Sequence, residues 1–167
     1  MGGSTISNIP VGIDVKDATL HLSAQLAKFR SCVDDESYML IGFDSNQDQN
    51  SLDASYQTDV HARLIEDIMW RIARDTDTEF DPGCFQYQGK WMPKEHRYAH
   101  NVFVKKPCLV RQGGNEFCFD RGQVLHLDNS YKFPVEMLIK CASNAGWNMV
   151  QRWTNTGRAL YVLLLAV

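Results

Sequence analysis

This sequence of 167 residues lacks a glycine-rich loop of the kind that binds nucleotides. The 11 glycines include two adjacent pairs, Gly2-Gly3 at the start and Gly113-Gly114 in a polar stretch. A glycine-rich loop binds a nucleotide because its backbone N–H groups approach the ligand between a strand and a helix. Neither pair has such a setting, so we expect no cofactor site of this kind and no bound cofactor.

Three further absences narrow the class of protein. The five cysteines form no CxxC or zinc spacing, and an odd count without a pairing rhythm is typical of a reducing compartment. The net charge is −3 with no basic stripe, which disfavours a nucleic-acid partner. The N-terminus lacks the apolar core of a signal peptide, and the apolar run 160–167 is too short to span a bilayer. These features predict a cytoplasmic protein without a membrane partner.

The first half of the sequence predicts helices around one strand. Apolar spacing favours a helix over 14–32 with Asp14 as its N-cap, and an apolar strand follows over 37–44. A helix leading into such a strand is typical of a mostly parallel sheet. A second helix is predicted over 53–74, with a possible break near Thr58. Its apolar stripe is predicted to contain Val60, Leu64, Ile68 and Ile72, and Ile65 and Met69 widen this stripe.

The second half of the sequence predicts mainly strands. Residues 85–91 mix aromatic and polar side chains and are expected to be irregular, whereas 98–110 and 116–120 read as a hairpin. A last helix over 134–145, with Pro134 at its first position, precedes a closing hairpin. The fold class is therefore α/β in one domain. We expect a small β-rich substrate lobe at about 45–130 and a sheet-containing core from 1–44 and 131–167.

Residues 123–133 alternate apolar and polar side chains, which predicts a strand with two different faces. His126, Asp128 and Ser130 fall on one face. Such a face is either solvated or the wall of a polar pocket, and composition favours solvation. These side chains match a catalytic triad in type only, because alternate strand residues lie about 6.6 Å apart. His96 and His100, four residues apart on the predicted strand, lack a nearby third metal ligand, so we expect no metal.

Residues 128–133 (DNSYKF) resemble an acidic-x-Ser-x-Lys-aromatic segment of one methyltransferase family. That family contains the histidine-specific N-methyltransferases of ergothioneine biosynthesis and the dimethylallyltryptophan N-methyltransferases of ergot alkaloid pathways. Residues 3–8 are similar to its Gly-Ser-Thr-Ile-Gly-Asn turn, 39–44 to its strand ending in Gly-x-Asp, and 55–64 to its Ala-Tyr-Asn-Asp…Thr-Ala-Arg-Phe segment. Residues 145–164 resemble its closing hairpin. The order agrees over nearly the whole chain, and implies a truncated Rossmann-like sheet lacking the S-adenosylmethionine half.

The resemblance implies roles for individual residues. Asp128 and Ser130 take the positions that contact the substrate side chain, with aspartate in place of the family's glutamate. Tyr56 takes the position that holds the amino-acid carboxylate, and Asn8 the position that orients the amino acid. Trp91, Tyr87 and Phe85 are candidates for the aromatic floor of a pocket, although core packing explains them at least as well.

Two departures from the family suggest a different chemistry. His61 stands where the family has threonine, and His100 lies near a family methionine. An imidazole beside a carboxylate is a usual combination for proton transfer near neutral pH. We therefore expect Asp128, His61 and His100 to be catalytic in a cofactor-free cyclase or isomerase of secondary metabolism. Its substrate would be amino-acid-derived or indole-type. A half-enzyme that needs a partner for methyl transfer, and a non-catalytic binding protein, remain open alternatives.

The same resemblance predicts a homodimer. Without the strands that precede it in the family, the strand near 39–42 has an unpaired edge with apolar flanks. Open edges of this kind are usually paired or covered. A second copy of the chain is the expected cover.

Overall fold

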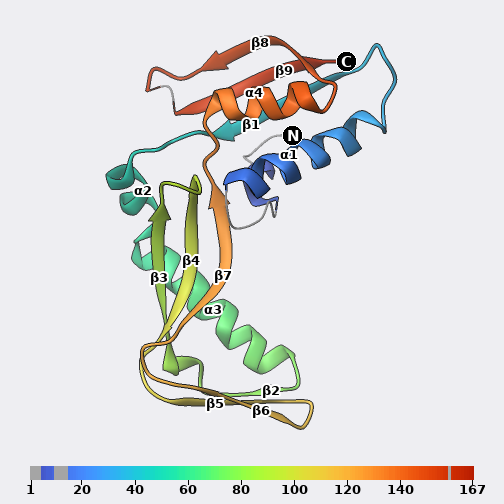
Figure 1. Ribbon diagram of the computed structural model, residues 1–167. Coiled ribbons are helices and arrows are strands. Elements are labelled where there is room, and N and C mark those ends of the chain that lie inside the picture. Colours follow the sequence, from blue (N-terminus) through green and yellow to red (C-terminus); the bar gives the residue numbers. More distant parts are fainter. Residues whose placement is uncertain (1–4, 10–14, 158) are drawn as a thin grey trace. The chain divides into compact units, whose positions relative to one another are not determined.

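The computed structural model describes residues 5–9, 15–157 and 159–167 (Figure 1). The predicted cap Asp14 lies outside these residues. The helical elements, including two short 3-10 helices written η, are η1 (Thr5–Asn8), α1 (Val15–Arg30), α2 (Gln49–Tyr56), α3 (Asp59–Asp75), η2 (Pro82–Cys84) and α4 (Val135–Asn144). The strands are β1 (Tyr38–Asp44), β2 (Thr78–Glu79), β3 (Phe85–Met92), β4 (Arg97–Val104), β5 (Cys108–Gln112), β6 (Asn115–Phe119), β7 (Val124–Tyr131), β8 (Asn148–Thr154) and β9 (Leu160–Ala166).

These elements divide into two units. Unit 1 contains residues 1–49, 91–98 and 129–167, and unit 2 contains residues 50–90 and 99–128. The sheet β3-β4-β7 contributes residues to both units. Each unit is described below by itself. The fold class is α/β, as predicted.

Unit 1 is built on the three-stranded sheet β1-β9-β8. β9 runs antiparallel to β1, with Gly42 opposite Val162, and antiparallel to β8, which has an irregularity between Met149 and Gln151. The predicted parallel pairing is therefore wrong for this sheet. The second strand of the closing hairpin, β9, lies directly beside β1 and runs in the opposite direction.

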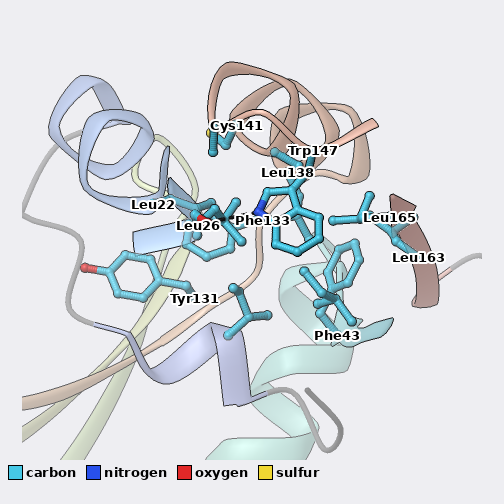
Figure 2. Packing of buried hydrophobic residues seen from close by; sticks show 14 of the residues in the cluster. Leu22, Leu26, Phe43, Tyr131, Phe133, Leu138, Cys141, Trp147, Leu163 and Leu165 are labelled. Atoms are coloured by element: carbon cyan, nitrogen blue, oxygen red, sulfur yellow. Dashed lines mark hydrogen bonds between the residues drawn. The ribbon is translucent and has the colours of Figure 1, made fainter. Parts of the chain in front are cut away.

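The core of unit 1 joins both ends of the chain. α1 contributes Leu22 and Leu26 and packs against α4, which contributes Leu138 (Figure 2). Trp147, which directly precedes β8, is buried among them, and its Nε1 donates to the carbonyl oxygen of Leu26 at 2.9 Å. Leu163 supplies the sheet side of this core. The indole N–H thus finds the partner that a buried tryptophan needs.

The last helix forms as its sequence indicates, except that its first residue lies one position later than predicted. Pro134 is the N-cap of α4 and not its first helical residue, because its ψ of 138° is extended. At the other end Gly146 has a φ of +83°, the left-handed conformation that favours glycine after a helix.

Unit 2 contains the sheet β2-β5-β6 and the helix α3. The predicted stripe of α3 is buried at its margin and not at its centre, because Val60, Leu64, Ile68 and Ile72 are 38–77% exposed. The core instead receives Ile65 and Met69 from the neighbouring side of the helix, together with Cys84, Phe85, Val102, Val104 and Cys108. Apolar side chains cover more than half of the circumference of α3, so their spacing in the sequence does not identify which of them are buried.

Two strand predictions also need correction. Residues expected to be irregular form β3, in which Phe85 and Trp91 are buried and the polar residues between them are largely exposed. The predicted strand over 98–110 is interrupted between Val104 and Cys108, where Pro107 lacks a backbone N–H for a ladder. None of the helices in the described ranges combines enough length and apolar character to cross a membrane.

Candidate functional site

The junction between α2 and α3 positions two of the predicted site residues. Tyr56 ends α2, and Thr58 is the N-cap of α3, whose side chain accepts a hydrogen bond from the backbone N–H of His61 at 3.2 Å. A threonine cap holds the first turn of a helix by satisfying one of its free N–H groups. The cap therefore fixes His61 in the first turn of α3, directly after the end of α2 at Tyr56.

His100 meets these residues from β4. It is 5% exposed, and its ring stacks on that of His61 with centroids 5.5 Å apart and an interplanar angle of 20°. Tyr56 lies edge-on to both rings, at 5.1 Å from each. Tyr87 of β3 completes the group, with its hydroxyl 2.9 Å from Nδ1 of His100. We call Tyr56, His61, Tyr87 and His100 the imidazole–tyrosine cluster, and all of it lies in unit 2.

The hydroxyl of Tyr87 stays protonated at neutral pH. Burial and, to a smaller extent, repulsion from the ionised form of Tyr56 together raise the pKa of Tyr87 to about 12. His100 forms this hydrogen bond in either neutral tautomer. Nδ1 accepts from the hydroxyl when Nδ1 is unprotonated, and donates to the hydroxyl oxygen when it is protonated. When Nδ1 carries the proton and donates to the tyrosine oxygen, Nε2 carries the lone pair. In that tautomer the imidazole is a base whose ring is oriented by a neutral phenol.

A pocket of about 250 Å³ adjoins the cluster through Tyr87. Its other lining residues come from the start of α3 and from β3: Gln57, Thr58, Asp59, Ala62, Gln88 and Gly89. The lining is mostly polar, with one carboxylate and two side-chain amides. Sites for drug-sized ligands are about 300–1,000 Å³, so this pocket suits a small polar group such as the end of an amino acid.

The described contacts assemble Tyr56, His61 and His100 but do not add Asp128 to them. Asp128 is exposed on β7 in unit 2, whereas the predicted chemistry requires a carboxylate in a partly buried pocket. The remaining predicted residues belong to unit 1. Asn8 is exposed at the end of η1, Ser130 is half-buried on β7, and Trp91 is buried on β3.

Of the polar residues of interest, sequence reasoning selected Tyr87, as pocket lining, but did not select Arg97. Tyr87 had a usable signal, because aromatic residues alternate with polar ones along residues 85–91, as in a strand with one buried face. Arg97 had none. It is buried in unit 1, where its Nη1 donates to Oδ1 of Asn129 and its Nε has no hydrogen-bond partner among the described residues.

A second polar network in unit 1 is structural. Nζ of Lys132 lies 2.8 Å from Oδ2 of Asp44, with the lysine side chain 5% exposed and the aspartate 23%. Gln47 donates through its Nε2 to the carbonyl oxygen of Lys132, and its Oε1 is 2.8 Å from Nδ1 of His96. His96 lies in the turn before β4, with a φ of +50°, and burial lowers its pKa. It is therefore not a strand neighbour of His100, and the described residues hold no cluster of three metal ligands.

Known proteins similar to this chain include two curated relatives. The uncharacterized protein y4iF of Sinorhizobium fredii is 28% identical over 110 residues, which cover 63% of this chain and 36% of the relative. The N-methyltransferase fsqC of Aspergillus fumigatus is 22% identical over 129 residues, which cover 75% of this chain and 35% of the relative. The chain thus spans about a third of the length of these relatives.

Solved structures of methyltransferases also match, at low similarity. The S-adenosylmethionine-dependent methyltransferase of Clostridium acetobutylicum gives a TM-score of 0.44 at 8% identity, with 98% of this chain and 55% of that chain covered. The CcbJ methyltransferase of Streptomyces caelestis gives 0.45 at 13% identity, with 99% and 58% covered. The sequence pattern of the family itself matches residues 2–167. This chain therefore belongs to the histidine-specific, S-adenosylmethionine-dependent methyltransferase family.

Proposed function

We propose that unit 2 binds a small amino-acid-derived acceptor of the histidine or indole type, and that the imidazole–tyrosine cluster accepts a proton from it. In this proposal the chain is the acceptor-binding part of an N-methyl transfer. The observation that carries it is the convergence of Tyr56, His61 and His100, which come from three separate elements. Family membership supports the reaction class.

The proposed step uses residues of this chain alone. An amine attacks a methyl donor through its lone pair, so a protonated amine must first lose a proton. Nε2 of His100 would accept that proton while Nδ1 remains bonded to Tyr87. A well-placed general base of this kind contributes about 100- to 10,000-fold in rate. Tyr56 and the stacked His61 would restrict the ring of His100 to one orientation.

The described residues do not fit S-adenosylmethionine. β1 is followed by a loop and then α2, but the loop 45–48 contains no glycine. Three of its four backbone N–H groups are already used: that of Ser45 bonds Ala159, that of Asn46 bonds Asp44, and that of Asp48 bonds Asn46. The described glycines with positive φ lie in one hairpin, a turn and a helix cap. We therefore propose that the methyl donor binds outside these residues.

A second candidate function rests on the two histidines themselves. They occupy positions where the resemblance has threonine and methionine, and they stack on each other beside a neutral phenol. Such a pair suits cofactor-free proton transfer, that is, cyclisation or isomerisation of an amino-acid-derived metabolite in secondary metabolism, in an alkaloid pathway for example. Both candidates use the same pocket, and they differ in whether a C–H bond of the ligand exchanges its proton.

One experiment separates the two candidates. The full chain is titrated calorimetrically with L-histidine and L-tryptophan, and each amino acid is then incubated with it in deuterium oxide and analysed by mass spectrometry. We expect His100→Gln and Tyr87→Phe to weaken binding about 10- to 100-fold, the range for losing a hydrogen bond to a charged group. His126→Gln is the matched control, because His126 is an exposed imidazole of unit 2 that lies outside the cluster and whose Nδ1 is 3.0 Å from Oδ1 of Asn101.

The outcomes lead to different conclusions. Binding that depends on His100, without deuterium in the ligand, supports the acceptor-binding function. Deuterium incorporation that requires His100 supports cofactor-free chemistry. Binding that His126→Gln weakens as much as His100→Gln does would refute a role for the cluster, and so would the absence of binding by both amino acids. Binding that persists in His100→Gln without exchange would indicate a non-catalytic binding protein.

We also propose that two copies of the chain associate through β1. This strand is at the edge of the sheet β1-β9-β8, and its Tyr38 and Leu40 are 67% and 52% exposed. An edge strand with exposed apolar side chains is a template for pairing. Light scattering at micromolar concentration should give a dimer, and Leu40→Lys should give a monomer. A monomeric wild type would refute this proposal.

A further inference from the structure

Arg97 is a buried cation in unit 1, and one of its buried donors lacks a partner among the described residues. It opens β4 and is 8% exposed. A guanidinium has five N–H donors. Within the described part of the chain, Nη1 donates to the side-chain oxygen of Asn129, and the buried Nε has no partner.

The charge of Arg97 is not balanced by the residues around it. The other buried cation of unit 1, Lys132, is paired with Asp44 at 2.8 Å, so these two charges offset each other. Asn129 is a neutral amide. No carboxylate of the described residues lies within ion-pair distance of Arg97. A buried charge without a counter-charge is costly, and such charges are normally paired.

The unbalanced guanidinium has the properties of an anion site. Its planar fork binds a carboxylate through two parallel N–H···O bonds, a geometry that lysine cannot supply. The bond from Nη1 to Asn129 holds one side of the guanidinium and so fixes its orientation. A single cation matches a monoanion, whereas a doubly charged phosphate would call for a second cation, and Lys132 is already held by Asp44.

We propose that Arg97 binds the carboxylate of a small molecule, with Asn129 as the residue that positions its guanidinium. This site lies in unit 1 and does not depend on which acceptor the imidazole–tyrosine cluster binds. It also differs from the roles that the family resemblance implies, which assign the carboxylate to Tyr56.

The test uses the full chain and two probes of equal size. Thermal unfolding is followed in sodium propionate, in propionamide, and, at matched ionic strength, in sodium chloride and in sodium phosphate. Because a ligand that binds only the folded state raises the unfolding midpoint, propionate should raise it more than chloride does, and neutral propionamide should not. Wild type alone gives this comparison, so it holds even if a variant fails to fold.

Variants then assign the effect to Arg97. Arg97→Met removes the charge and should abolish the extra rise, whereas Arg97→Lys keeps the charge without the fork and should weaken the propionate response about tenfold in concentration. Arg152→Met is the matched control, since it removes one exposed arginine of unit 1 and should keep the full response. Equal responses to propionate in wild type and Arg97→Met would overturn the proposal. So would a wild type that propionate and chloride affect alike, or one that inorganic phosphate stabilises more than propionate does.

Discussion

The buried pair of Lys132 and Asp44 offers a test of how the two ends of unit 1 are held together. Asp44→Asn leaves the lysine ammonium buried without this carboxylate, while the amide still accepts the hydrogen bond from the backbone of Asn46. Breaking a buried pair by removing one partner costs about 3–5 kcal/mol in the free energy of unfolding. The lysine side chain is nearly inaccessible, so water cannot replace the lost partner.

The reverse substitution should cost less. Lys132→Met keeps the buried methylene packing and leaves the carboxylate of Asp44, which is 23% exposed and keeps its bond from Asn46. A carboxylate that water can reach loses less when its partner is removed, so we expect a cost of about 1–3 kcal/mol. Glu136→Gln in the exposed pair with Arg152 is the control, with an expected cost of about 0–1 kcal/mol.

The assay is urea unfolding of each variant, followed by circular dichroism, together with the double variant Asp44→Asn/Lys132→Met. The double variant should lose less stability than the sum of the two single losses. Lys132→Met removes the buried charge whose carboxylate partner Asp44→Asn has already removed. The reasoning is wrong if Lys132→Met costs as much as Asp44→Asn. It is equally wrong if Asp44→Asn costs no more than Glu136→Gln.

Three further predictions follow from buried groups. Trp147→Phe removes the donor to the carbonyl of Leu26 and should cost about 1–3 kcal/mol in urea unfolding; an unchanged midpoint would contradict this. Burial raises the pKa of Tyr87 from 10.0 to about 12, so its contribution to stability is complete below pH 10 and is lost as the pH rises toward 12. Urea midpoints at pH 9 to 11.5 should therefore fall more steeply for wild type than for Tyr87→Phe. A thiol reagent at neutral pH should modify exposed Cys118 long before buried Cys84, whose pKa is raised to about 11; equal rates would refute this order.

The ends of a helix or strand could be predicted from the sequence where residues close to those ends determine them. The break near Thr58 is real, because a threonine there caps a new helix. The end of the last helix is marked by Gly146, whose positive φ most other residues adopt only with strain. The strand over 123–133 and the closing hairpin also form as predicted. In each case the determining signal lies within a few residues of the element.

Features that depend on contacts between distant segments could not be predicted in this way. Both Leu64 and Ile65 are apolar, but only Ile65 is buried, because β3 and β4 pack on that side of α3. The parallel pairing predicted for 37–44 failed for the same reason. Pairing direction is decided by which strand arrives beside β1, and β9 is more than a hundred residues away in sequence.

The candidate site was predictable only where the family resemblance supplied spatial information. Tyr56, His61 and His100 lie on three elements, and no periodicity relates them, yet the resemblance assigned them to one pocket and their rings are in contact. Arg97 shows the converse. An arginine before an apolar strand reads as a surface residue, and no pattern in the neighbouring sequence indicates that it is buried.

The segment 128–133 shows why a motif must be interpreted residue by residue. Tyr131, Lys132 and Phe133 are buried in unit 1, where the lysine is held by Asp44 from another segment of the resemblance, so this half of the motif is structural. Asp128, in contrast, is an exposed residue of β7. Asp128→Asn should therefore change stability by less than about 0.5 kcal/mol, as exposed substitutions usually do. Any loss of ligand binding in that variant would then report on recognition, whereas a loss caused by a change at Lys132 would report on folding.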